Sequence, residues 1–140
     1  MHDLGIVIVN WNTRDYLKRC LETVLASTGD FSSTVVVVDN ASSDGSAEMV
    51  RVDFPGVELI ASTVNGGYPY GNNLGLRALG YRGVGNVAKD APRYALLLNP
   101  DTELPPTALY DMIQYMDAHP QVGVAGYRMK AELVAPYKGK

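Results

Sequence analysis

The chain has 140 residues, the size of one ordinary domain, and 46% of them are hydrophobic, which is enough to bury a single core. Lys and Arg total 12 against 15 Asp and Glu, so the net charge of -3 offers no basic field to a nucleic-acid backbone. No apolar run approaches the roughly 20 residues that cross a bilayer, and the start at Met1 lacks the cationic region of a signal peptide. We therefore expect a cytoplasmic protein without a transmembrane segment or a nucleic-acid partner.

Two apolar runs predict the first strands. Residues 4–9 and 34–38 are unbroken and rich in β-branched side chains, as in parallel strands that are covered on both faces. Between them, apolar side chains recur at i, i+3, i+4, i+7 and i+8, which predicts an amphipathic helix with Asn12 or Thr13 as its N-cap. Cys20 falls on the apolar stripe of this helix, so we expect it to pack in the core.

The middle of the chain continues the alternation of strand and helix. Ser43 or Asp44 is the expected cap of a short helix, and residues 57–61 read as a third strand. Residues 65–75 are too rich in glycine and asparagine for a regular element until a helix resumes near Asn72.

The last elements follow an exposed loop over residues 81–92. Residues 94–98 predict a strand, residues 109–116 carry a helical stripe, and residues 122–126 predict a fifth strand. From 129 to 140 the periodicity fails, so we divide the chain into a domain at 1–128 and an irregular tail at 129–140. Alternating strands and helices imply an α/β fold with a three-layer, doubly wound, mainly parallel sheet.

Polar residues stand at three predicted strand ends, namely Asn10, Asp39 and Asp101. In open α/β sheets ligands bind beyond the carboxyl ends of the strands, so these residues are expected to face a ligand. A carboxylate at such a position is suited to hold a divalent metal on a phosphate. The alternative for Asp101 is that it caps, with Thr102, the helix that follows.

Several other classes of site are disfavoured by missing motifs. The first strand is followed by Asn10-Trp11-Asn12 rather than by a G-x-G-x-x-G turn, which argues against nicotinamide or flavin binding. No glycine-rich turn ends in Gly-Lys-Ser or Gly-Lys-Thr, as a P-loop requires. A serine hydrolase or a zinc site would need histidines, but the chain has only His2 and His119, in a terminus and at a helix end.

The order of the motifs resembles that of a known family. The motifs are Ile6 to Asn12, Val35 to Ser46, the Asn65-Gly66-Gly67 loop leading to Asn73, and Leu97 to Glu103. In order and spacing they resemble the family 2 glycosyltransferases of GT-A fold, most closely the rhamnosyltransferase-like branch. The likeness covers residues 4–128 and implies the N-terminal, donor-binding part of such an enzyme.

The resemblance implies a nucleotide-sugar donor linked to UDP or dTDP. Asp39 would accept a hydrogen bond from the imide N–H of uracil or thymine. The D-x-D element of the family falls on Asn99-Pro100-Asp101, where Asp101 would bind Mg²⁺ or Mn²⁺ on the diphosphate. Asn99 departs from the first acid of that element and keeps an acceptor for ribose. The donor-binding residues implied in this way are Val9, Asn10, Trp11, Asp39, Asn40, Gly67, Asn73, Asn99 and Asp101.

Structural roles remain open for several of these positions. Asp44 is expected to be a turn or cap residue rather than a ligand, and Asn73 caps a helix as readily as it contacts a donor. Glu103 fits the first turn of a helix equally well. Packing and stacking on the base or sugar are both open for the aromatic residues Trp11, Tyr68 and Tyr70.

The reaction of the resembled family inverts the configuration at the anomeric carbon of the sugar. It uses a carboxylate from the second half of the chain as general base. After Glu103 the chain offers only Asp111, Asp117 and Glu132, and none of them is expected near the chemistry. We therefore expect a donor-binding half that lacks its base, from a longer enzyme of cell-wall or polysaccharide biosynthesis. Such an enzyme would act on a glycan or lipid-linked acceptor, in the cytoplasm or at the inner face of the membrane. The alternative is a non-catalytic nucleotide-binding or interaction module.

Overall fold

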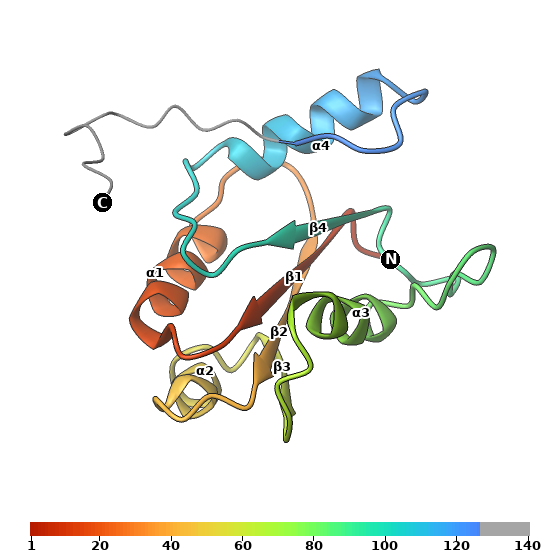
Figure 1. Ribbon diagram of the computed structural model, residues 1–140. Coiled ribbons are helices and arrows are strands. Elements are labelled where there is room, and N and C mark those ends of the chain that lie inside the picture. Colours follow the sequence, from red (N-terminus) through yellow and green to blue (C-terminus); the bar gives the residue numbers. More distant parts are fainter. Residues whose placement is uncertain (127–140) are drawn as a thin grey trace, which may run out of the picture.

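The computed structural model describes residues 1–126, so the predicted tail lies outside the described residues. Four strands alternate with four helices in this part of the chain (Figure 1). The elements are β1 (Leu4–Asn10), α1 (Arg14–Leu25), β2 (Ser33–Asn40), α2 (Ser46–Asp53), β3 (Glu58–Ser62), α3 (Tyr68–Ala78), β4 (Tyr94–Leu98) and α4 (Ala108–Ala118).

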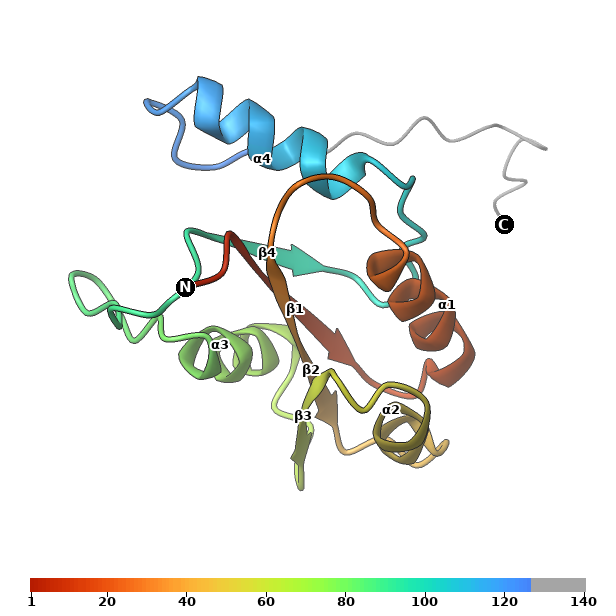
Figure 2. The same ribbon diagram turned by 180° about the vertical axis from the view of Figure 1, so that it is seen from behind.

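The four strands form one parallel sheet in the order β3-β2-β1-β4. Helices α1 and α2 lie on one face of the sheet and α3 lies on the other, as Figures 1 and 2 show from opposite sides. This arrangement confirms the predicted three-layer, doubly wound α/β fold. The chain runs outward from β1 to β3 and then crosses to β4 on the other side of β1. The strand order therefore reverses between β1 and β4, which is where ligands bind in such sheets.

Strand β1 is the centre of the fold because both of its faces are covered. All seven of its residues are buried. Ile6 and Ile8 pack in the core beneath α1 and α2, whereas Val7 and Val9 belong to a second core beneath α3. Since side chains of a strand alternate between faces, a continuous apolar run is what a strand between two helical layers requires. Cys20 is also fully buried, as its position on the apolar stripe predicts.

Helix α3 approaches β1 closely through two glycines. A β-carbon placed on Gly75 would lie 2.3 Å from Cγ1 of Val7, and one placed on Gly71 would lie 2.6 Å from Cγ1 of Val9. Positions i and i+4 of the helix thus meet two residues on the same face of the strand. This packing directs the start of α3 to the carboxyl end of β1.

One predicted helix boundary and one predicted strand are wrong. Helix α3 begins at Tyr68 rather than near Asn72, since Pro69 suits the first turn of a helix and the later glycines serve packing. The predicted fifth strand at 122–126 does not form: these residues pair with no strand, and Val124 is 90% exposed. Gly123 and Gly126 interrupt this short apolar segment, and glycine weakens a strand.

The close approach of α3 gives a first prediction. Gly75→Ala should lower the free energy of unfolding by about 1–3 kcal/mol, because the added methyl group overpacks the contact with Val7. Gly56→Ala is the matched control, since a β-carbon there meets nothing within 4 Å. Urea denaturation of both variants measures the difference. An equally stable Gly75→Ala protein would contradict the packing described for α3.

Candidate functional site

The carboxyl ends of the strands bring together residues that are far apart in the sequence. Asn10 and Asp39 are register partners at the ends of β1 and β2. Leu98, the last residue of β4, follows on the other side of β1, opposite Ile8, and leads into Asn99. The three strand ends predicted from the sequence therefore lie along one edge of the sheet.

Asn10 and Asp39 form a buried polar pair, 0% and 3% exposed respectively. Asn10 Nδ2 donates to Asp39 Oδ1 at 3.0 Å, and the backbone N–H of Ser42 donates to Asp39 Oδ2 at 3.0 Å. The Thr13 hydroxyl donates to Asn10 Oδ1 at 2.6 Å. The protein thus orients both carboxylate oxygens, and each oxygen keeps a lone pair for a further donor.

The turns that follow β1 and β2 are strained and tied to each other. Asn12 and Ala41 have φ values of 50° and 58°, a left-handed conformation that costs energy in a residue with a side chain. The Asn12 N–H donates to Ser42 Oγ at 2.9 Å, and the Ser43 N–H donates to Asn12 Oδ1 at 2.8 Å. These reciprocal bonds hold the two turns, and hence the Asn10–Asp39 pair, in one arrangement.

Gly45, not Ser43 or Asp44, stands at the N-cap position of α2. Asp44 lies in the turn before it, and its carboxylate accepts from the first N–H of two helices. Its Oδ1 accepts from the N–H of Ser46 at the start of α2, and its Oδ2 accepts at 2.9 Å from the N–H of Arg14 at the start of α1. Thr13 occupies the N-cap position of α1, yet its hydroxyl bonds Asn10 instead of capping. Burial acts to raise the pKa of Asp44, but the hydrogen bonds from Ser46 and Arg14 together lower it below 3.8.

Asn40 joins the end of β2 to the loop before α3. Its Nδ2 donates to the carbonyl oxygen of Gly67 at 3.1 Å, and Gly67 has a φ of 90° that favours glycine. Asn73 lies exposed on α3, whereas the side chain of Val9 is buried against Gly71. Only the backbone of Val9 is therefore available to a ligand.

The sequence did not single out Asn72, which the structure places in the interior of α3's packing surface. The Oδ1 atoms of Asn40 and Asn72 are both buried and have no hydrogen-bond partner among the described residues. Buried amide oxygens without a donor are rare in folded proteins. The sequence around Asn72 is rich in glycine and gives no sign that its side chain is buried, because this burial depends on how closely α3 packs on the sheet.

Two exposed polar side chains follow β4. Asn99 accepts a hydrogen bond at 3.2 Å from the hydroxyl of Tyr68, at the start of α3. Asp101 has no side-chain hydrogen bond or ion pair within residues 1–126. Thr107, not Asp101 or Thr102, stands at the N-cap position of α4, so the capping alternative for Asp101 is wrong.

The neighbours of Asp101 have other partners. Glu103 lies before α4, where its Oε1 pairs with Arg19 Nε at 2.8 Å. Burial, together with the charge of Asp101, raises the pKa of the Cys20 thiol to about 12. The thiol therefore stays protonated. Among the described residues, Asp101 is the carboxylate after β4 whose side chain has no hydrogen bond or ion pair.

A divalent metal fits this strand end only if the protein and a bound phosphate group both coordinate it. Within the described part of the chain, no three His, Cys, Asp or Glu side chains cluster closely enough to form a metal site. Mg²⁺ is commonly held by one or two carboxylates together with substrate phosphates, and Asp101 supplies one such carboxylate. The residues present thus suit a metal that arrives with a diphosphate.

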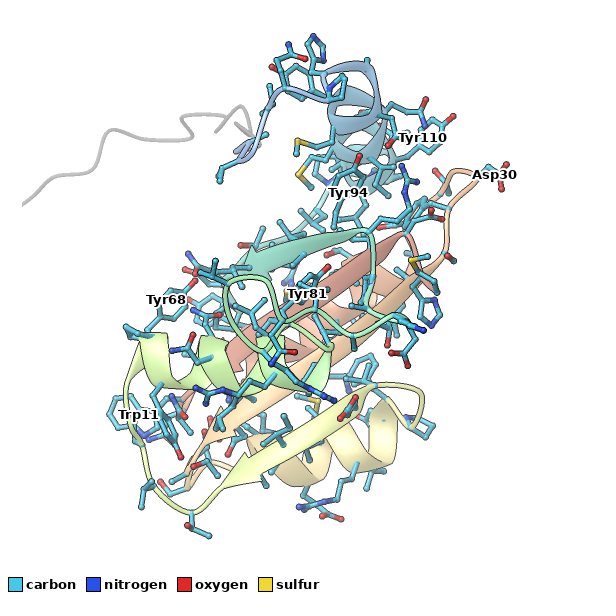
Figure 3. The ribbon with its side chains drawn as sticks, turned by 90° about the vertical axis from the view of Figure 1, so that its right-hand side faces the viewer. Trp11, Asp30, Tyr68, Tyr81, Tyr94 and Tyr110 are labelled. Atoms are coloured by element: carbon cyan, nitrogen blue, oxygen red, sulfur yellow. The ribbon has the colours of Figure 1, made fainter. Side chains whose placement is uncertain are left out.

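Three aromatic side chains near the strand ends are partly exposed. Trp11 is 56% exposed, and Tyr68 and Tyr70 also keep large solvent-facing surfaces. Figure 3 shows Trp11 and Tyr68 at the end of the sheet where α3 begins. Their exposure argues against plain core packing, although the ring of Tyr70 lies against Gly66. Trp11 and Tyr68 therefore stay the candidates for stacking on a ligand.

The parallel sheet with helices on both faces has the fold of a GT-A domain. The chain belongs to the family described as "Glycosyl transferase family 2", whose model matches residues 5–137. It is 32% identical over 117 residues to the succinoglycan biosynthesis protein ExoO of Rhizobium meliloti (strain 1021), covering 83% of this chain and 30% of that protein.

Solved structures share the fold at low sequence identity. TarS 1-349 of S. aureus, solved in complex with UDP, matches with a TM-score of 0.67 and 19% identity over 91% of this chain and 38% of that one. The mannosyltransferase PcManGT from Pyrobaculum calidifontis, solved with GDP-Man and Mn2+, matches with a TM-score of 0.66 and 20% identity over 82% of this chain and 32% of that one. The chain thus spans about a third of the length of its relatives.

Among the described residues, no helix is long and apolar enough to cross a membrane.

The two bonds from helix starts to Asp44 give a second prediction. Asp44→Ala should lower the free energy of unfolding at pH 7 by about 1–3 kcal/mol, because losing a side-chain acceptor at a helix start costs about 0.5–2 kcal/mol. Since the pKa of Asp44 is depressed in the folded state, its contribution is present above pH 3.8 and is lost as the pH falls through the lower, folded-state value.

Urea denaturation at pH 7 and near pH 2 tests this prediction. The difference between the parent and Asp44→Ala should shrink at the lower pH. Asp90→Ala, at an exposed loop position, is the control and should change little at either pH. A difference that stays constant with pH would show that the ionised carboxylate is not what caps the helices.

Proposed function

We propose that the chain is the donor-binding domain, over residues 1–128, of a glycosyltransferase that transfers a sugar from a UDP- or dTDP-linked donor with inversion. The observation that carries this proposal is the buried, oriented Asn10–Asp39 pair beside the free carboxylate of Asp101, on the two sides of the point where strand order reverses. Membership of glycosyl transferase family 2 supports sugar transfer. The UDP complex of TarS, which has the same fold, supports a nucleotide-linked donor.

In this proposal Asp39 recognises the base. Its two oxygens each accept one hydrogen bond from the protein, and each keeps a lone pair for a further donor. A carboxylate accepts from the imide N–H of uracil or thymine and repels the acceptor edge of cytosine. Trp11 has an exposed ring that would stack on the base, and Asn10 and the backbone of Val9 would lie beside it.

The diphosphate would lie over the ends of β1 and β4. Asp101 would hold Mg²⁺ or Mn²⁺ against it, and the metal would neutralise the departing diphosphate. The Mn2+ complex of PcManGT supports the use of a divalent cation in this fold. Asn40, Gly67 and Asn73 would border the sugar from the side of α3. Of these, Asn40 also has a buried Oδ1 without a partner in the described structure.

We assign no general base. Asp111 accepts from Thr107, and Asp117 is bound by Arg93 and Tyr94 at the opposite end of β4. Asp117 therefore lies away from the strand ends, and Glu132 lies outside the described residues. We propose that a segment beyond the described residues supplies the base and binds a glycan or lipid-linked acceptor, in the cytoplasm or at a membrane surface. The relative named for succinoglycan biosynthesis supports a role in polysaccharide assembly. A rhamnosyl donor is the more specific form of this proposal.

A second candidate function is nucleotide-sugar binding without transfer. The observation behind it is that the described residues include a candidate donor site but no carboxylate that we assign as a general base. Acceptor-dependent release of UDP or dTDP distinguishes the two functions.

The third prediction concerns the metal. UDP or dTDP at about 100 times its Kd should stabilise the protein by ~2.7 kcal/mol, and the effect should depend on Mg²⁺ or Mn²⁺. Asp101→Ala should remove the metal dependence because it removes the only carboxylate proposed to hold the cation. Thermal denaturation with and without the cation measures both effects.

The control for this experiment is Asp30→Ala, which removes a carboxylate at the opposite end of the molecule (Figure 3). It should leave the metal dependence intact. If the parent protein gains no stability from nucleotide and metal together, the proposed donor site is wrong.

The fourth prediction concerns the base. Asp39→Asn should weaken UDP and dTDP by ~1.5–3 kcal/mol, the usual worth of a hydrogen bond to a charged group. Inorganic pyrophosphate should bind as before, since it has no base. Calorimetric titration measures each affinity, and circular dichroism checks that the variant is folded. Equal weakening of all three ligands would mean that Asp39 acts only on the structure of the turns.

A further inference from the structure

One hydrogen bond links α3 to the end of β4 across the edge of the sheet. The hydroxyl of Tyr68 donates to Oδ1 of Asn99 at 3.2 Å, over a separation of 31 residues. A tyrosine hydroxyl either donates or accepts, whereas an amide oxygen only accepts. The proton of Tyr68 therefore points at Asn99.

This bond determines which atoms Asn99 offers to a ligand. With Oδ1 turned to Tyr68, the two N–H groups of Nδ2 are turned away from it, and they have no acceptor among the described residues. The Asn99 side chain is exposed, so these donors are accessible. In this orientation Asn99 presents its two N–H donors, while Oδ1 keeps one lone pair, so the expectation that Asn99 accepts from ribose stays a prediction.

The scaffold fixes the position of Tyr68. Its helix begins at a proline in the first turn and is held by the Asn40–Gly67 hydrogen bond. One turn further along, Gly71 packs against Val9 of β1. These three features position the backbone of α3 at Tyr68 without involving Asn99. Tyr68 lines, together with Asn99, an open groove of about 430 Å³ beside β4.

On the basis of the proposed function, we propose that Tyr68 is a positioning residue that sets the amide of Asn99 to donate to an oxygen of the donor's diphosphate. Hydrogen bonds from N–H groups are strongest to anionic oxygens. A carboxylate at position 99 would need a cation between itself and the diphosphate, because the two are negative. An oriented amide binds the diphosphate directly and leaves Asp101 alone to hold a metal.

Calorimetric titration with UDP and Mg²⁺ tests this role with single and double variants. Tyr68→Phe removes only the hydroxyl and should weaken UDP about three- to tenfold, the range expected for one hydrogen bond. Uridine, which lacks the diphosphate, should bind as before. Tyr70→Phe is the matched control, since Tyr70 lies on the same helix turn and its hydroxyl makes no hydrogen bond with the described residues.

The double variant separates orientation from a general effect on structure. In Asn99→Asp the two side-chain oxygens are equivalent, so there is no amide left to orient. Adding Tyr68→Phe to Asn99→Asp should therefore change UDP affinity by less than about twofold, a coupling that a double-mutant cycle detects. A loss as large as in the parent background would overturn the proposal, and so would equal weakening of uridine.

A measurement without nucleotide isolates this inference from the proposed function. In nitrogen-15 spectra the side-chain amide signals of Asn99, identified by their absence in Asn99→Asp, should move in Tyr68→Phe and stay in place in Tyr70→Phe. Unmoved signals in Tyr68→Phe overturn the orienting role even if UDP binds. Failure of UDP to bind the parent protein overturns the proposed function and, with it, the diphosphate assignment.

Discussion

The hydrogen bond between Asn10 and Asp39 is the interaction on which the strand-end site depends. It joins neighbouring strands where their ladder ends, and burial makes both partners costly to leave unpaired. The strained turns after β1 and β2 follow directly on this pair. Hydrogen bonds between Asn12 and the two serines that follow Ala41 hold the two turns together. Strain of this kind persists only where the surrounding structure determines it, and it is concentrated at functional sites. The carboxylate of Asp39 is thereby presented in one orientation.

The second half of the site comes from the other side of the sheet. Gly71 and Gly75 let α3 lie so close to β1 that its first residue, Tyr68, reaches the end of β4. The same topology places α3 on the opposite face of the sheet from α1 and α2. It also reverses the strand order between β1 and β4. The packing of one helix thus brings Tyr68 within hydrogen-bonding distance of Asn99. Fold and proposed chemistry share a single constraint.

The sequence predicts the elements whose residues interact with near neighbours or with a uniform core. Strands buried on both faces read as continuous apolar runs, so β1 and β2 were found within a residue or two of their ends. The bond of Asp44 to Ser46, two residues away at the start of α2, follows from local turn chemistry, but its bond to Arg14 spans 30 residues and has no local signal. Glycines that serve close packing concealed the start of α3, and the Tyr68–Asn99 contact depends on that packing. Residues 122–126 have a strand-like composition but pair with no strand.

The central claim is that nucleotide binds across the ends of β1, β2 and β4. A nitrogen-15 chemical-shift titration of the protein with UDP and Mg²⁺ tests it most directly. The account predicts that the backbone signals of Asn10, Asp39 and Asp101, and the indole signal of Trp11, shift together and saturate at one affinity. Shifts confined to the groove between β4 and α4, with those four signals unmoved, would contradict it.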